Sequence, residues 1–383
     1  MYSIDYDGSI LYDPRDEKRD IRDASARISV ATSEDISTGE MKFTIQADHP
    51  EFNRLKLMTG IMELKQDDAP VFRGRIARDI MDMDLSHVIE VESVFTCLND
   101  SVIPPFDFPS DHANVTAYQT AAASGNVVEY FLNWILTQHN SQVSNEQKLY
   151  CGTVTVTDPN NYISRSQEDY ATTLDVIKGK LLDLLGGYMV LRYTSSGTYI
   201  DYLATFTAVN SQAVEYASNL TNFEREIDST EIFNEILPIG DEGLTIASLD
   251  DGQISTDLYK TGVTIYSASG RARFRHKIIK IVEWSDVTVA ANLKTKAAAE
   301  LAAHNGGAAS ESISCTAIDL SYAEGTDVEA FRVGRMTPVK SAPHGLDASY
   351  PLTEISIPDL KRPGSTEITL GNVTVTLSAT VHR

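Results

Sequence analysis

The first hundred residues consist of short segments of alternating apolar residues, and their close spacing constrains the fold more than any other feature. Five segments follow one another, "ARISVATSED", "EMKFTIQA", "GIMELKQDD", "VFRGRIAR" and "VIEVESV". In the second, the apolar Met41, Phe43 and Ile45 alternate with polar residues, which is typical of a strand with one buried face. Short strands at this spacing, separated by Gly, Asp and Ser turns, favour a barrel or a sandwich.

The connector of one predicted hairpin carries side chains of the kind that bind metals. The segment 71–93 has two apolar-alternating arms, and its connector contains four potential ligands, Asp79, Asp82, Asp84 and His87. These residues lack the spacing and the glycine of an EF-hand loop. Acidic residues in a hairpin loop are ordinarily solvated. We therefore predict a strand pair with a solvated acidic connector and no metal site.

The pattern changes to mixed helix and strand after residue 100. The segment 101–114 is rich in proline and aromatic residues and predicts an ordered linker. In "NVVEYFLNWILTQHN", apolar residues recur at spacings of three and four, which predicts a helix with Asn126 as its N-cap. A strand is expected next at "GTVTVTD".

Gly186 and Gly187 follow an apolar helical segment and precede a hairpin that turns at Ser196-Gly197. A phosphate-binding loop needs the order strand, glycines, helix, so that the N–H groups of the helix face the anion. Here the order is helix, glycines, strand, which indicates a helix C-cap. From about residue 213 strand patterns return, and one long helix is predicted at 285–305, with Ser285 as N-cap and Gly306-Gly307 after its end.

The charge of the chain disfavours stable nucleic-acid binding. Its formal net charge is −22, and an acidic surface repels phosphate. One basic stretch, "SGRARFRHK" at 269–277, alternates Arg271, Arg273, Arg275 and Lys277 with other residues. As a strand it would place these charges on one face. We interpret it as an inter-subunit salt-bridge strip, with a nucleic-acid groove as the alternative.

The sequence predicts no catalytic, cofactor or metal site. It contains no HExxH or GxSxG motif and no papain-like cysteine context. His139 and His304 are expected at helix ends, where a cation suits the helix dipole, and Trp134 and Trp284 are expected in the core. The abundance of carboxylates leaves a glycosidase-type pair open.

The three cysteines, Cys97, Cys151 and Cys315, lie far apart and predict buried thiols rather than disulfides or a zinc knuckle. The N-terminus is acidic and rich in turn formers, unlike a signal peptide. No window approaches the ~20 apolar residues of a membrane span. We expect a soluble chain that is made in a reducing compartment.

Several stretches together resemble a known family. The N-terminal set is "ILYDP", "FTIQADHPEFNRLKLMTGIMEL", "VFRGRI" and "LNDSVIPP". The middle set is "HNSQV", "GTVTVTDPNNYISR", "KLLDLLGGYMVLRY" and "YIDYLA". The C-terminal set is "VEYASNLTNF", "EILPIG", "HKIIKIVEWSDVT", "TAIDLS", "FRVG", "SAPHGLD" and a final "LG". In this order they resemble the N-terminal hub module of phage tail proteins labelled tail-associated lysin, prophage tail endopeptidase or minor structural protein, which occur in phages and prophages of Gram-positive bacteria.

The resemblance implies a β-rich α+β fold and a structural role at the distal end of the tail, after assembly in the host cytoplasm. It implies a homotrimer whose two barrel-like domains per subunit form a pseudo-sixfold ring, similar to the central baseplate hub of contractile phages. The implied partners are a distal tail protein hexamer, the tape measure protein and tip or receptor-binding proteins, with DNA only passing through the lumen and no stable membrane insertion. An acidic lumen would let DNA slide without sticking.

On this basis we expect four parts. They are a first tube-type β-barrel domain at 1–100, an α+β middle domain at 101–212, a second tube-type β-barrel domain at 213–240 and 308–383, and a peripheral α+β segment with the long helix at 241–307. "TGIMELK" and "VGRMTPVK" share a Gly-x-Met-then-Lys pattern, which is consistent with a duplicated barrel but too short to establish one.

The resemblance departs from the longer family members at the C-terminus. Their lytic and carbohydrate-binding regions follow the hub module, whereas this sequence ends at "TVTLSATVHR". It is either a short structural form or a piece of a longer protein, and we expect no enzyme in it. Two alternatives remain, a peptidoglycan-degrading tail lysin and a host cell-wall-binding module. Zymogram activity abolished by one carboxylate or His substitution would favour the first, and wall binding without distal tail protein binding would favour the second.

Overall fold

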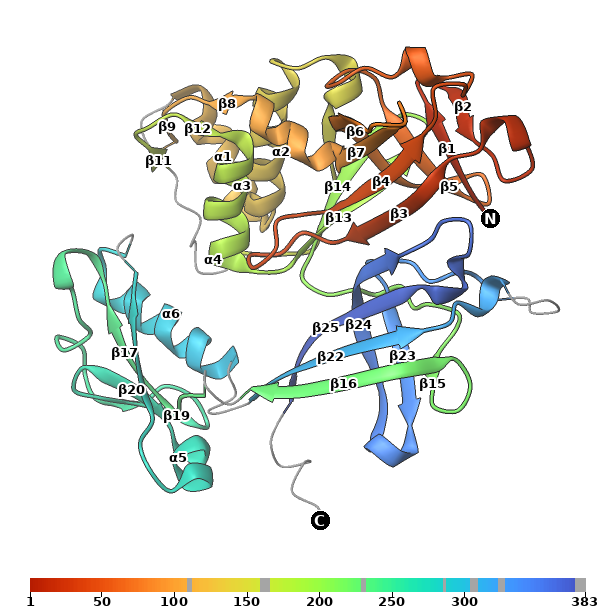
Figure 1. Cartoon of the computed structure of the whole chain (residues 1–383). Helices are drawn as coiled ribbons and strands as arrows, with labels where there is room; N and C mark the ends of the chain where they lie inside the picture. Colours follow the sequence, from red (N-terminus) through yellow and green to blue (C-terminus); the bar gives the residue numbers. More distant parts are fainter. Residues whose placement is uncertain are drawn as a thin grey trace. The chain divides into compact units, whose positions relative to one another are not determined.

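A computed structural model of the chain describes residues 1–108, 112–158, 166–228, 232–284, 287–303, 309–322 and 328–375. The chain divides into two compact units (Figure 1). Unit 1 comprises Met1–Phe223 and Ser314–Gly371, and unit 2 comprises Glu224–Ile313 and Asn372–Arg383. No helix in these ranges is both long and apolar enough to cross a membrane.

The N-terminal part of unit 1 is a sheet of seven strands. They are β1 (Tyr2–Tyr6), β2 (Ser9–Tyr12), β3 (Arg22–Ser29), β4 (Gly39–Ile45), β5 (Met62–Gln66), β6 (Ala69–Met81) and β7 (His87–Ser93). Their spatial order is β2-β1-β5-β6-β7-β4-β3. Met41, Phe43 and Ile45 are buried as the alternation predicts, and β6 pairs antiparallel with β7. The strands and the hairpin expected in residues 1–100 are confirmed.

Strands from the C-terminal part of the chain extend the same sheet. They are β15 (Val214–Glu215), β16 (Leu220–Asp228), β22 (Ala309–Ala317), β23 (Met336–Ser341), β24 (Leu346–Ile357) and β25 (Glu367–Val375). The path continues from β3 through β24, β25 and β22 to β16, and β23 pairs with both β24 and β15. The β-rich α+β class is therefore confirmed. Among the described strands the path does not close on itself, so the expected barrels are not confirmed.

A helical block with its own short strands follows the N-terminal sheet in the chain. Its helices are α1 (His112–Ser124), α2 (Val127–Asn140), α3 (Thr173–Ile177) and α4 (Asp183–Leu185). Its strands are β8 (Val102–Ile103), β9 (Phe106–Asp107), β10 (Leu149–Val154), β11 (Ser166–Gln167), β12 (Ala171–Thr172), β13 (Tyr188–Thr194) and β14 (Gly197–Leu203). The strands form a three-stranded sheet, β10-β14-β13, and the two-stranded pairs β9–β11 and β8–β12.

Helix α2 supplies the apolar face that the sequence predicts. Val127, Val128, Phe131, Leu132 and Ile135 are all buried in one cluster with residues of β13 and β14. Asn126 does occupy the N-cap position, but its side chain accepts no capping hydrogen bond. Helix α1 was not predicted, because its sequence "HANVTAYQTAAAS" follows a proline-rich segment and lacks a continuous apolar stripe. The expected strand at "GTVTVTD" starts earlier, as β10.

The glycine pair terminates a helix, as predicted. Helix α3 continues through a π-helical turn, Lys178–Leu182, into α4, and Gly186 follows with a left-handed φ of 65°. Such a φ is favourable only for glycine among common residues. The expected hairpin is β13 and β14, which pair antiparallel down to Thr194 and Gly197.

Unit 2 is a small α/β structure with its own core. Its strands are β17 (Glu235–Ile239), β18 (Gly252–Gln253), β19 (Leu258–Thr261), β20 (Thr264–Ser267) and β21 (Ile279–Glu283), in the order β18-β19-β20-β17-β21. Helices α5 (Ala268–Phe274) and α6 (Ala290–Ala303) belong to the same unit. Leu293, Ala297 and Leu301 form the buried face of α6. Trp284 is partly buried against this core, as Trp134 is against the core of the helical block.

The structure of unit 2 differs from the sequence predictions at the basic stretch 269–277 and at the start of the long helix. The basic stretch 269–277 is not a strand, because α5 occupies its first part: the Ser267 side chain caps the helix at the Gly270 N–H, and Arg275 ends it with a left-handed φ of 58°. The long helix starts at Ala290, later than expected. Ser285, His304 and Gly306-Gly307 lie outside the described residues. The division of the chain into four parts stays a prediction.

Candidate functional site

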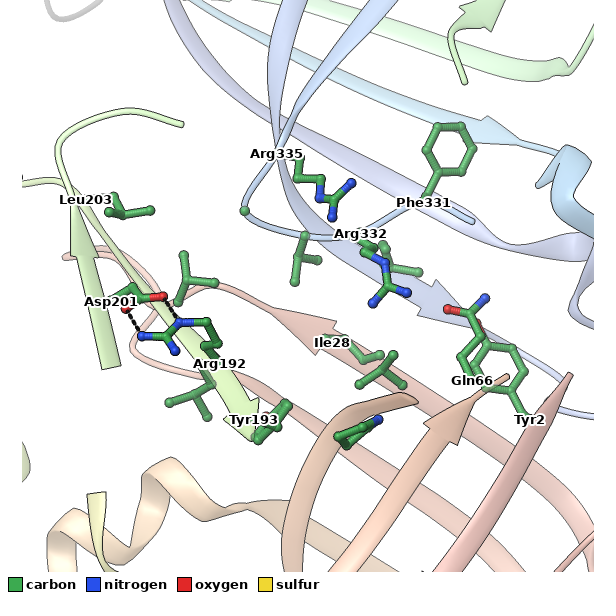
Figure 2. Close-up of a pocket in the computed structure, with 17 residues that line it drawn as sticks. Tyr2, Ile28, Gln66, Arg192, Tyr193, Asp201, Leu203, Phe331, Arg332 and Arg335 are labelled. Carbon is green, nitrogen blue, oxygen red and sulfur yellow. Dashed lines mark hydrogen bonds and ion pairs between the residues drawn. The ribbon is translucent and has the colours of Figure 1, made fainter. Parts of the chain in front are cut away.

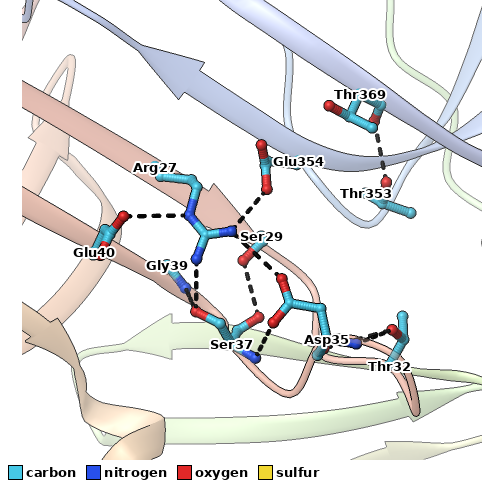
Figure 3. A network of polar contacts seen from close by, with 10 residues as sticks. All are labelled: Arg27, Ser29, Thr32, Asp35, Ser37, Gly39, Glu40, Thr353, Glu354 and Thr369. Carbon is cyan, nitrogen blue, oxygen red and sulfur yellow. Dashed lines mark hydrogen bonds and ion pairs between the residues drawn. The ribbon is translucent and has the colours of Figure 1, made fainter. Parts of the chain in front are cut away.

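The two β-rich parts of unit 1 join where β24 pairs antiparallel with β3, from Glu354 opposite Ser29 to Ile357 opposite Ala26. Arg27 lies at the centre of this junction (Figure 3). Its guanidinium contacts Glu354 at 3.0 Å and Asp35 at 3.4 Å. It also contacts the Glu40 carboxylate at 3.6 Å and the Ser37 hydroxyl at 3.1 Å. One cation therefore links β24, β3, β4 and the loop between β3 and β4.

Gly39 allows the close approach of β4 to β3 at this junction. Its φ is +121°, and a Cβ atom at this position would lie 2.2 Å from the Arg27 carbonyl oxygen. Real Cβ atoms do not approach an oxygen so closely, and L-residues rarely adopt this φ. The junction therefore requires glycine at position 39.

The polar face of the sheet carries two rows of paired charges. In the first row, Arg27 lies opposite Glu40, Glu40 opposite Glu92, and Glu92 opposite Arg75. The Arg75 guanidinium is buried, contacts Glu92 at 2.7 Å and also binds Asp100. Each arginine in this row therefore faces at least one carboxylate from a neighbouring strand.

In the second row, Lys42 of β4 and Arg78 of β6 flank Glu90 of β7. The Lys42 ammonium lies 3.2 Å and the Arg78 guanidinium 3.0 Å from the Glu90 carboxylate. The side-chain hydrogen bond from Lys42 is the largest of the effects that lower the pKa of Glu90. Because the cations in both rows already have carboxylate partners, this face offers few basic groups to an incoming phosphate.

The hairpin connector uses its acidic side chains locally. Asp79 contacts the Nδ1 atom of His87 at 2.6 Å, across the hairpin. The Asp84 carboxylate accepts hydrogen bonds from the Ser86 N–H and hydroxyl, at 3.0 Å and 2.6 Å. In the ranges that the structure describes, no group of three or more His, Cys, Asp or Glu side chains could hold a metal ion.

His139 is not a solvated cation at a helix end, contrary to the dipole interpretation. It is fully buried, its Nδ1 lies 2.6 Å from the Ser101 hydroxyl, and its Nε2 lies 3.1 Å from the Gln147 carbonyl oxygen. Burial lowers the pKa of His139. Ser101 and His139 are hydrogen-bonded like a nucleophile and its base. Both are buried, so in this conformation a substrate does not reach the serine, and the pair fixes α2 to the residue just before β8.

Unit 1 is therefore expected to lose stability as the pH falls below about 6.5. The unfolded chain, in which histidine has its ordinary pKa of about 6.5, takes up the proton more readily than the folded chain. Above about pH 6.5 the neutral His139 makes its full contribution to the free energy of unfolding. Between about pH 6.5 and the lowered pKa of His139 in the folded chain, the free energy of unfolding decreases by at most about 1.4 kcal/mol per pH unit. The buried His49, whose pKa is also lowered by burial, acts in the same direction.

Urea unfolding at pH 7.5, 6.5 and 5.5 measures how the free energy of unfolding depends on pH. Ordinary carboxylates titrate below this pH range, so they contribute little to the change. His139→Gln keeps a hydrogen-bonding side chain and should reduce the slope. A free energy of unfolding that is constant or rises toward pH 5.5 would contradict the assignment.

The described thiols differ in exposure. Cys97 is buried, whereas Cys151 is only partly buried, so the prediction of buried thiols holds for the first alone. Burial raises the pKa of each to about 11. Both thiols are therefore protonated and weakly nucleophilic at neutral pH. The side chain of Cys315 lies outside the described set.

Two basic residues of the stretch 269–277 form ion pairs within unit 2. Arg271 and Lys277 both bind the buried Glu235, with Lys277 at 2.6 Å. Burial alone would raise the pKa of Glu235, but the hydrogen bonds from Lys277 and Arg271 outweigh it and lower the pKa. These two charges therefore already have a partner inside the chain, and the inter-subunit salt-bridge strip stays a prediction.

Comparison with solved structures finds the same fold in three tail proteins. The 43 kDa tail protein of prophage MuSo2 from Shewanella oneidensis matches with a TM-score of 0.53 at 11% identity, over 97% of each chain. Prophage tail protein gp18 from Listeria monocytogenes matches with a TM-score of 0.52 at 15% identity, over 99% of this chain and 96% of that one. The tail protein from Neisseria meningitidis matches with a TM-score of 0.52 at 14% identity, over 96% of each. The whole chain thus has the fold of prophage tail proteins.

The sequence gives a second, independent result. Residues 208–381 match the family described as prophage endopeptidase tail. No curated protein matches the chain. Residues 208–381 are thus similar to that family, over somewhat less than half of the chain.

Proposed function

We propose that this chain is the structural hub at the distal end of a phage tail. In this proposal it forms a homotrimer that docks on the hexameric distal tail protein and continues or closes the DNA channel of the tail tube. The observation that carries it is the β3–β24 junction, which joins two β-rich parts of one chain into a single hydrogen-bonded sheet. Three copies with two such parts each would present six β-rich parts to a sixfold partner.

A local equivalence between the two β-rich parts supports this arrangement. In "TGIMELK" and "VGRMTPVK" the methionines, Met62 and Met336, are the first residues of β5 and β23. Two residues earlier in each case stands a glycine with a left-handed φ, 70° at Gly60 and 77° at Gly334. The shared sequence pattern therefore places a left-handed glycine two residues before a strand in both places, as a duplicated β-rich part would have.

The paired charges of the sheet suit a surface that DNA passes. Arg27, Lys42, Arg75 and Arg78 each contact carboxylates on neighbouring strands. On a chain with a net charge of −22, such a face has little attraction for phosphate and would let DNA slide. We therefore propose that this polar face lines the lumen. Its acidic character would come from six carboxylates around these four cations, namely Asp35, Glu40, Glu90, Glu92, Asp100 and Glu354.

Solution mass tests the hub, measured by light scattering at several concentrations with and without a candidate distal tail protein. We expect a trimer, or a monomer that assembles as three copies on the partner's ring. A monomer that ignores the partner at every concentration would refute the hub. The family description includes an endopeptidase, so a cell-wall lysis assay on the same sample tests the enzymatic alternative. Wall binding without partner binding would favour the host-binding module.

A further inference from the structure

The tip of the β6–β7 hairpin exposes an unusual number of apolar side chains. Met81, Met83 and Leu85 are 63%, 102% and 59% exposed. We call these three residues, together with the exposed Asp82 between them, the hairpin tip. Apolar side chains gathered on one protruding turn are typical of a docking element rather than of ordinary surface.

Two backbone hydrogen bonds close the turn at the hairpin tip, and one of its residues has an unfavourable backbone conformation. Asp82 donates its N–H to the Ser86 carbonyl at 2.8 Å, and Leu85 donates its N–H to the Asp82 carbonyl at 3.0 Å. Leu85 has a left-handed φ of 64°, a conformation that leucine rarely adopts and glycine adopts freely. A leucine that is kept exposed in a strained turn points to a role for its side chain outside this chain.

A pocket of about 310 Å³ lies at the other end of the same strand. Its walls include apolar and aromatic residues from β1, β3, β6, β13 and the segment 331–335, namely Tyr2, Ile28, Val71, Val190, Tyr193 and Phe331 (Figure 2). Pro70 and Val71, at the start of β6, line the pocket, whereas Met81 ends the strand at the hairpin tip. At about 3.3 Å per residue, the strand separates the two by roughly 30 Å.

The pocket is cationic on an acidic chain. Arg192, Arg332, Arg335 and Asp201 all line it. Arg192 and Asp201 pair with each other through two hydrogen bonds, and Arg335 contacts Glu329 only at 3.4 Å. Within the described ranges, no ion pair or side-chain hydrogen bond engages the Arg332 guanidinium, which Figure 2 shows among the lining residues. A carboxylate flanked by apolar side chains would complement this pocket.

We propose that the hairpin tip of one copy of this chain inserts into the Arg332 pocket of a second copy. Met83 and Leu85 would fill the apolar part of the pocket, and Asp82 would pair with Arg332. Because the tip and the pocket lie at opposite ends of β6, the tip of one copy cannot reach the pocket of the same copy. The contact therefore joins two copies head-to-tail. Such a contact closes a ring when the rotation per copy allows it. The inference specifies the contact inside the proposed trimer and in that respect rests on the proposed function.

The test uses two full-length variants that each disable one side, Met83→Asp for the tip and Arg332→Glu for the pocket. Sedimentation velocity over a range of concentrations should show the wild type as an oligomer and each variant with a dissociation constant raised at least tenfold. Mixed in equal amounts, the two variants retain one intact contact, from the tip of the Arg332→Glu copy to the pocket of the Met83→Asp copy. The mixture should therefore form a dimer and stop there.

Controls separate the contact from general effects. Val209→Asp puts a charge on another exposed apolar side chain, 53% exposed and outside the tip, and Arg362→Glu makes the same charge change as Arg332→Glu at an exposed arginine outside the pocket. Both should assemble like the wild type. Leu85→Gly removes the side chain that enters the pocket, so it should weaken assembly. It also relieves the unfavourable φ, so the unfolding midpoint should not fall. Weaker assembly at an unchanged midpoint would exclude misfolding as the cause.

The outcomes distinguish this inference from the hub proposal. If the wild type is a trimer and both site variants are too, the tip–pocket contact is wrong and the hub proposal stands. If the variants dissociate but the wild type forms an oligomer other than a trimer, the contact stands and the trimeric hub is wrong. A wild type that is monomeric at every concentration overturns the contact.

Discussion

Replacing Gly39 by alanine is expected to destabilise unit 1 by at least about 3 kcal/mol, the sum of an unfavourable φ and an overpacked contact. The φ of +121° and the 2.2 Å approach of the new Cβ to the Arg27 carbonyl oxygen act together. Both atoms involved belong to the backbone, so no side-chain rotation relieves the clash. β4 or β3 must shift, and the contacts of Arg27 with Glu40 and Ser37 shift with it.

Chemical denaturation of the full chain measures this effect. Gly364→Ala is the matched control, because it has no unfavourable φ and nothing lies within 4 Å of its Cβ position. Gly364→Ala should change the free energy of unfolding by less than about 0.5 kcal/mol, as surface substitutions do. Equal stabilities of the two variants would show that β4 does not approach β3 as described.

Phe131→Ala is expected to cost about 3–5 kcal/mol, the usual range for removing a buried aromatic ring. Phe131 is fully buried in the core of the helical block. Its ring stacks on Trp134 at a centroid distance of 6.1 Å and meets Phe106 and Phe108 at 5.8 Å each. Three aromatic neighbours of this size relax poorly into a cavity, so the loss should lie toward the upper end of the range.

Tyr170→Ala removes a ring that is 72% exposed in the same block and serves as the control. It should leave stability nearly unchanged. Near-UV circular dichroism adds a second measurement, because loss of the ring beside Trp134 should reduce the tryptophan signal. A Phe131→Ala variant as stable as Tyr170→Ala would place Phe131 outside the core.

Local periodicity made much of the fold predictable. The alternation around Phe43 and the three-and-four spacing around Phe131 each report which face is buried, and both assignments are confirmed. The same rule failed at 269–277, where arginines alternate as in a strand. There the Ser267 cap and the left-handed Arg275, which are effects of single residues, produce a helix instead.

The junction and the pocket could not be predicted from the sequence, because they depend on contacts between distant segments. Nothing in the residues around Arg27 indicates that its partner is Glu354. Arg332 stands in "FRVG", which carried a family resemblance but no sign of a cavity. The burial of His139 was missed for the same reason, since its hydrogen bonds to Ser101 and Gln147 become apparent only when α2 packs on β8.

The β3–β24 pairing also bears on how the chain is made. Arg27 and Glu354 are 327 residues apart in the sequence, and at about 5–20 residues per second a ribosome needs roughly 20–60 s to synthesise that interval. Once β7 has been made, for most of this time, β3 would be the open edge of the N-terminal sheet and could pair with the same edge of another nascent chain. Polysomes carrying several such chains would favour wrong pairing, and chaperone occupancy of β3 until β24 emerges would prevent it.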